Sequence, residues 1–148
     1  MLNEIPRINY QALCNEDDQV NKFELDKLKT AVTKYGFLII KNYPIDLEKI
    51  ENVFLLYKQF FKLPFEEKNK VNMSTTLSNR GWGGIKAEQV NANFNPDNKE
   101  IFDCGPDIRI KHKFEDLPYY SKNIWPDQIP CFEENIINFY NSCSEISI

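Results

Sequence analysis

Histidine is almost absent from this chain of 148 residues, which contains only His112. A metal site built on two imidazoles needs two histidines, so the chain cannot supply such a site by itself. The sequence also lacks an apolar run of 18 residues, the length that a membrane-spanning helix needs. Its first residues mix Glu4, Pro6 and Arg7 with apolar side chains, which is not the pattern of a secretory signal. We therefore expect a cytoplasmic protein with no membrane partner.

The four cysteines include no Cys-x-x-Cys pair. In a cytoplasmic protein the thiols are expected to be reduced. We predict that Cys104 and Cys143 act as small buried hydrophobes. A disulfide framework, or a nucleophilic cysteine with His112 as its base, remains an alternative that no local motif supports.

Positive charge is not in excess, because 18 basic residues face 22 acidic ones for a net charge of -4. This balance gives no reason to expect a nucleic-acid partner. Hydrophobic residues make up 42% of the chain, aromatic residues 14% and charged residues 27%. Such a composition is typical of a globular domain and excludes wholesale disorder.

The first third of the chain predicts a strand, a helix and a second strand. Residues 5–10 alternate apolar and polar side chains around Pro6, which suits a short edge strand. Asp17 and Asp18 can cap a helix that begins near Gln19 and ends at Gly36. The apolar run that follows, 37–40, has the length of a buried strand.

Two further helices have a clear apolar period. One opens at Asp46 and ends at Leu63, with a predicted buried stripe of Leu47, Ile50, Phe54, Tyr57 and Phe61. A short, exposed helix is predicted after Pro64, with Glu66 and Glu67 in its first turn. The last helix begins near Cys131 and is still apolar at Ile148, on a stripe of Phe132, Ile136, Phe139 or Tyr140, and Cys143. The fold class expected is α+β, with about three amphipathic helices and short strands.

The segment between these helices, residues 74–110, loses the helical period and contains the best candidate for a binding site. Lys99 to Asp103 is its best strand. Arg80, Trp82 and Lys86 lie around a cluster of glycines and could form the mouth of a site for an anionic, partly apolar ligand. The alternative is structural: an arginine paired with Glu88 or Glu100 and a packed indole.

Several segments occur together in a specific order. They are Ile5-Pro6, Tyr35 to Asn42, Phe60 to Lys68, Asn79-Arg80-Gly81-Trp82, Lys86-Ala87-Glu88, Pro96 to Asp107, Asn123 to Pro126, and Ile129 to Phe132. Over essentially its whole length the chain resembles the N-terminal region of the isopenicillin N synthase-like, 2-oxoglutarate- and Fe(II)-dependent oxygenases. It departs from that pattern at Cys131, where a glycine is common in the family.

The resemblance implies a non-haem dioxygenase N-terminal domain over residues 1–148, truncated within its last helix. The catalytic double-stranded β-helix, or jelly roll, would be missing and would be its partner in the same or a separate chain. In the family, Fe(II) is held by a His-x-Asp pair and a second histidine, and 2-oxoglutarate by an Arg-x-Ser pair. His112 is followed by Lys113 and Phe114, and no Arg-x-Ser pair occurs. We therefore expect no catalytic residue, metal ligand or bound cofactor in this chain, and an exposed His112.

Three functions follow from these observations. The chain is expected to pack against the jelly roll of an oxygenase and to shape its substrate entrance without catalysis of its own. It could instead be a standalone protein-interaction module that uses its apolar helix faces. A small-ligand site at Arg80, Trp82 and Lys86 is the third hypothesis.

Overall fold

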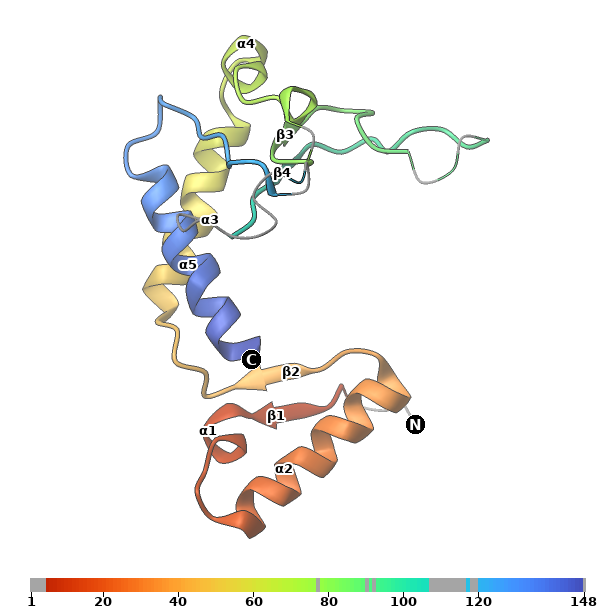
Figure 1. Ribbon diagram of the computed structural model, residues 1–148, viewed down its shortest axis with the longest axis vertical. Helices are drawn as coiled ribbons and strands as arrows, with labels where there is room; N and C mark the ends of the chain where they lie inside the picture. The colour runs from red at the N-terminus through yellow and green to blue at the C-terminus, as the bar shows by residue number, and fades with distance from the viewer. Residues whose placement is uncertain are drawn as a thin grey trace. The chain divides into compact units, whose positions relative to one another are not determined.

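The computed structural model describes residues 5–76, 78–89, 91, 93–106, 117 and 120–147 (Figure 1). His112 and Arg109 lie outside these residues, so the prediction of an exposed His112 stays a prediction. The chain divides into two compact units, Met1–Ile45 and Asp46–Ile148, which are described separately. Both contain helices and short strands, which confirms the mixed helix and strand content that the sequence predicts. None of the described helices is long and apolar enough to cross a membrane.

The first unit is a strand–helix–strand arrangement. It contains β1 (Arg7–Asn9), α1 (Tyr10–Leu13), α2 (Asp18–Thr30), the π-helical turn η1 (Ala31–Tyr35) and β2 (Ile39–Lys41). The side chain of Asp17 accepts a hydrogen bond from the Gln19 amide at 2.9 Å and so caps α2, as predicted. Gly36 ends η1 in the left-handed region at φ 77°, where glycine is favoured. The strands β1 and β2 pair in parallel, with Ile8 opposite Ile40.

The prediction of a buried second strand is wrong in its burial. The strand forms as β2, but Phe37, Ile39 and Ile40 are exposed. Leu25 and Val32, expected on the buried face of the helix before it, are exposed as well. An apolar run predicts burial only if enough protein is present to cover it, and unit 1 contains 45 residues.

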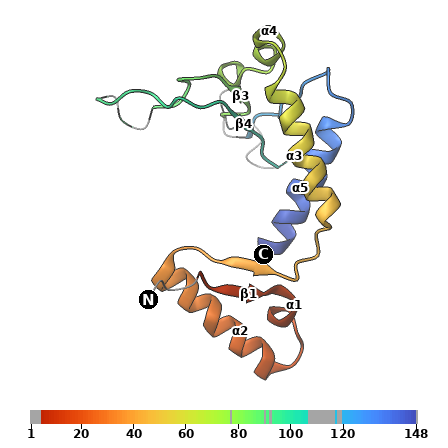
Figure 2. The ribbon, with the colours of Figure 1, turned by 180° about the vertical axis from the view of Figure 1, so that it is seen from behind.

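The second unit contains the hydrophobic core. Its elements are α3 (Leu47–Phe61), α4 (Phe65–Asn69), η2 (Met73–Thr75), β3 (Gly81–Gly83), β4 (Ile101–Asp103) and α5 (Phe132–Ser147). Helices α3 and α5 lie side by side, as both ribbon views show (Figures 1 and 2). Phe60 and Phe132 are fully buried between them and contact Phe102 of β4 at ring-centroid distances of 4.8 and 5.5 Å. Trp125 stacks on Phe102 and so packs on the core.

The buried stripe of α3 differs from the predicted one. Val53, Leu56 and Phe60 are buried, whereas Leu47 is 66% exposed and Phe54 is 72% exposed. Tyr57 lies on both the predicted and the observed stripe, so the two stripes overlap on the helix. Contacts with the core determine which of them is buried. On α5 the buried residues are Phe132, Ile136 and Ile137.

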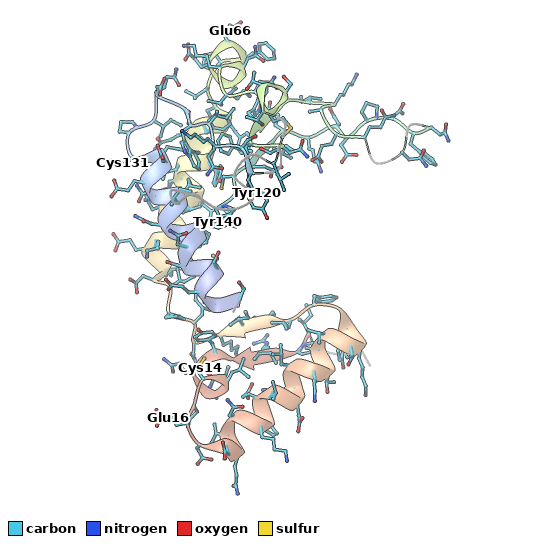
Figure 3. The ribbon with its side chains drawn as sticks, viewed as in Figure 1. Cys14, Glu16, Glu66, Tyr120, Cys131 and Tyr140 are labelled. Atoms are coloured by element: carbon cyan, nitrogen blue, oxygen red, sulfur yellow. The ribbon has the colours of Figure 1, made fainter. Side chains whose placement is uncertain are left out.

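The cysteine prediction is also only partly right. Cys104 is half-buried beside the core, but Cys143 is exposed. Cys14 and Cys131 are exposed too, the latter at the start of α5 (Figure 3). All four thiols are free in the structure.

Candidate functional site

The strand pair β3–β4 brings together the residues around the predicted site. It is antiparallel, with Trp82 opposite Phe102 and Gly81 opposite Asp103. Gly81 has φ 106°, and a Cβ atom there would lie 2.3 Å from the Val71 carbonyl oxygen. The backbone comes close to Val71 here, and the Trp82 amide donates a hydrogen bond to the Val71 carbonyl oxygen at 2.7 Å. This position therefore requires glycine.

Trp82 is a core residue, with 2% of its surface exposed. Its indole Nε1 donates to the Glu100 carboxylate at 3.1 Å. The same carboxylate oxygen receives the Lys68 ammonium at 2.6 Å, and Lys68 Nζ lies 5.4 Å from the centre of the indole ring. The packed indole of the structural alternative is therefore present, but Lys68 rather than Arg80 pairs with Glu100.

The buried lysine was missed by the sequence analysis, which assigned α4 to the surface. Lys68 is buried, although Phe65 on the same helix is exposed. The hydrogen bond from Lys68 lowers the pKa of Glu100, burial opposes this, and the Trp82 hydrogen bond adds to it. An alternation of Glu and Lys in a short helix resembles a solvated face, so only the position of Glu100 reveals that Lys68 turns inward.

The half-buried Arg80 lies beside Gly105. A Cβ atom on Gly105 would fall 1.5 Å from Arg80 Nη1, so the guanidinium occupies the space that a side chain would fill. Gly105 is itself fixed, because its amide donates to Asn123 Oδ1 at 2.9 Å and its carbonyl accepts from Asn123 Nδ2 at 3.0 Å. Arg80 Nε is buried and has no hydrogen-bond partner among the described residues. A buried donor without a hydrogen-bond partner costs free energy, so it favours binding of a hydrogen-bond acceptor from a ligand.

Burial raises the pKa values of three side chains in this region, Asp103, Cys104 and Tyr57. Burial, then repulsion from Glu88, raises the pKa of Asp103, with Arg80 and Lys99 partly offsetting the shift. Burial raises the pKa of the Cys104 thiol, which Tyr57 and Arg80 oppose. Burial likewise raises the pKa of Tyr57.

Lys86 lies in the turn that follows β3. It is exposed, in the left-handed region at φ 70°, and its amide donates to the Asp97 carbonyl at 2.9 Å. Glu88, the other partner suggested for Arg80, pairs instead with Lys99 at 2.7 Å.

The residues present do not fit the iron site of an oxygenase. A facial triad needs two histidines and a carboxylate, and the chain has one histidine. Within the described ranges, no three side chains of His, Cys, Asp or Glu come together as metal ligands. We therefore derive no catalytic step through iron or 2-oxoglutarate from this chain alone.

A family model described as "non-haem dioxygenase in morphine synthesis N-terminal" matches residues 5–128. The chain belongs to this family, as the N-terminal domain of a 2-oxoglutarate-dependent oxygenase, which confirms the resemblance in the sequence. It is 30% identical to a proline hydroxylase of Petromyces alliaceus over 98% of this chain and 45% of that protein. It is also 30% identical to a homoarginine-6-hydroxylase of Arabidopsis thaliana, over 83% of this chain and 37% of the relative.

Solved structures agree with this assignment. A full-length Neurospora crassa protein, crystallised with alpha-KG and thymine, superposes with a TM-score of 0.78 at 27% identity. The match covers 99% of this chain and 47% of the Neurospora crassa protein. A 2OG-Fe(II) oxygenase family protein of Caulobacter crescentus gives a TM-score of 0.77 at 26% identity, over 97% of this chain and 45% of its own. The chain thus spans less than half the length of these relatives.

Proposed function

We propose that this chain serves as the N-terminal region of a 2-oxoglutarate- and Fe(II)-dependent oxygenase, where it packs against a catalytic jelly roll and shapes the substrate entrance. It performs no catalysis alone, because the iron ligands and the co-substrate arginine lie in the jelly roll. The observation that carries the proposal is the exposed apolar face of α3, with Leu47 and Phe54 mostly in solvent. Large apolar side chains gathered on one helix face mark a surface for further protein.

The length of the relatives indicates the partner. The relatives carry more than half of their residues beyond the part that this chain matches. That remainder has room for a jelly roll of its own, and the α3 face offers it an apolar surface. An alternative occupant is an unrelated protein, which is what the standalone interaction module requires.

A fusion protein tests the proposal. Residues 1–148 are joined to the remainder of the Petromyces alliaceus proline hydroxylase, and Fe(II)-dependent consumption of 2-oxoglutarate is measured. We expect consumption by the fusion and none by the 148-residue chain. Activity of the 148-residue chain alone contradicts the proposal. An inactive fusion also contradicts it if circular dichroism shows that its jelly roll is folded.

Arg80 favours a second role for the same region, as the part of the substrate entrance that binds an anion. Its half-buried guanidinium, and an Nε without a hydrogen-bond partner among the residues that the structure describes, support this idea. Trp82 would report binding from the core rather than touch the ligand, and Lys86 would add charge at the rim. Titration of the chain with 2-oxo acids should change its indole fluorescence, and Arg80→Ala should abolish the change. No response to any 2-oxo acid removes this role.

A further inference from the structure

A cavity of about 640 Å³ lies where the chain leads into α5. Small-molecule sites in proteins measure about 300–1,000 Å³, so this volume is that of a ligand site. Arg80 is not among the residues that line it. Six apolar or aromatic residues form its walls: Trp125, Pro126, Ile129, Pro130, Phe132 and Ile137. Three of them, Ile129, Phe132 and Ile137, are buried, so the cavity reaches the interior of the second unit.

The charged side chains that line this cavity all have the same sign. They are Asp127, Glu133 and Glu134, and no basic residue accompanies them. Among the described residues, none of the three carboxylates forms an ion pair. A smaller cavity of about 180 Å³ shares Asp127 and contains Lys70, but Glu67 pairs with the Lys70 ammonium at 2.7 Å. The larger cavity therefore combines apolar walls with unpaired negative charge.

The dipole of α5 explains only part of this charge. Glu133 and Glu134 lie in the first turn of the helix, where a carboxylate interacts favourably with the helix N-terminus. The effect falls off within that turn, so it gives no reason for Asp127, which precedes the helix. Nor does it require apolar walls beside the carboxylates. The two features together fit a ligand that has both an apolar body and a positive charge.

We propose that this cavity binds a small organic cation, namely an amine with an apolar body. The body packs against the walls at Trp125 and Ile137, and the ammonium group lies among the three carboxylates. A concave site lined by charge of one sign raises the local concentration of the opposite ion. Burial of the apolar body supplies the rest of the affinity. The inference goes beyond the proposed function and is independent of it, because every residue of the cavity belongs to this chain.

Calorimetric titration of the 148-residue chain with matched ligands tests the charge and the apolar body separately. Hexylamine, hexanol and hexanoate share one apolar chain and differ in charge. We expect hexylamine to bind at least about tenfold more tightly than hexanol, and hexanoate to show no binding. The preference for the amine should shrink to less than about threefold when the salt concentration is raised from about 0.01 M to about 1 M. Methylamine, which lacks the apolar body, should bind at least about tenfold more weakly than hexylamine.

Two double variants locate the binding site. Asp127→Asn with Glu134→Gln removes two carboxylates from the cavity and should weaken hexylamine binding at least about fivefold. Glu51→Gln with Glu145→Gln removes the same charge at exposed positions outside the cavity. This matched control should bind hexylamine as the wild type does.

The thiol of Cys131 provides a second measurement on the wild-type chain (Figure 3). Cys131 is exposed and lines the cavity, whereas Cys14 and Cys143 are exposed but do not line it. At a hexylamine concentration of about ten times the Kd, alkylation of Cys131 by iodoacetamide should slow about tenfold. Alkylation of Cys14 and Cys143 should proceed at an unchanged rate.

Equal affinity for hexylamine and hexanol overturns the inference, as does unchanged alkylation of Cys131 when hexylamine is bound. Full affinity of the Asp127 and Glu134 double variant also overturns it. Should that variant fail to fold, the alkylation of Cys131 in the wild-type chain decides the matter. None of these measurements depends on 2-oxoglutarate consumption by the fusion, so failure of this inference and failure of the proposed function are distinguishable.

Discussion

The Lys68 ammonium and the Glu100 carboxylate are joined at 2.6 Å, although Lys68 is buried and lies 32 residues before its partner. The Trp82 indole donates to the same carboxylate oxygen at 3.1 Å. Three segments, α4, β3 and the residues before β4, therefore meet at one carboxylate. It stabilises the region that also holds Arg80.

Removing the Glu100 carboxylate alone should lower the stability of the chain more than removing both members of the Lys68–Glu100 pair. Glu100→Ala leaves the buried Lys68 unpaired, and we expect a loss of about 2–3 kcal/mol, below the value for a fully buried pair because Glu100 is partly exposed. The double variant Lys68→Met, Glu100→Ala should recover part of the loss, since no buried charge remains. Urea denaturation monitored by indole fluorescence measures both. Equal stability of the single and double variants would show that Lys68 is not dependent on Glu100.

The lowered pKa values of Glu100 and of Glu24, where hydrogen bonds, chiefly from Lys27, outweigh the effect of burial, give the stability a pH dependence. Because the folded pKa lies below the unfolded one, the unfolded chain binds more protons, and stability is present above the unfolded value of 4.5 and falls as the pH drops below it. Asp103 contributes in the opposite sense, since its folded pKa is raised. Thermal melts between pH 7 and pH 3 should show a smaller acid loss for Glu100→Gln than for the wild type. Asp26→Asn, at an exposed position on α2, is the control and should follow the wild-type curve.

Phe54 and Phe60 form a matched pair on α3, because one is 72% exposed and the other fully buried. In the 148-residue chain, Phe60→Ala should cost about 3–5 kcal/mol by leaving a cavity, whereas Phe54→Ala should change stability by less than about 0.5 kcal/mol. In the fusion, Phe54→Ala should become destabilising. Chemical denaturation of each variant beside its parent protein gives the comparison. A Phe54→Ala effect that is the same in both contexts would mean that this face meets nothing.

Gly105 and Gly81 should respond differently to alanine. At Gly105 the new Cβ meets the Arg80 guanidinium, so Gly105→Ala is expected to cost about 1–3 kcal/mol, and adding Arg80→Ala should relieve much of it. At Gly81 the Cβ meets the Val71 carbonyl oxygen, and no side-chain truncation relieves that contact. A double-mutant cycle on Gly105 and Arg80 checks the coupling. Strict additivity would mean that the guanidinium does not occupy this space in solution.

Local sequence signals placed the helix ends well. Asp17 caps α2, Gly36 ends η1 and Lys99 to Asp103 contains β4, because caps, glycines and alternation act through neighbouring residues. The order of motifs likewise gave the family, which the match to residues 5–128 confirms. The assignment of Arg80, Trp82 and Lys86 to one entrance stays a proposal, although the structure places Trp82 in the core.

The sequence alone determined the elements, the family and the lack of a second histidine, since these depend on residue types and short-range spacing. Only the tertiary structure decided that α3 buries Phe60 rather than Phe54, that Lys68 turns inward to Glu100, and that the buried Glu24 accepts a hydrogen bond from the Asn9 amide. Each depends on contacts between residues far apart in the chain. A helix with two overlapping apolar stripes has no local preference between them, and the choice is made by what packs against it.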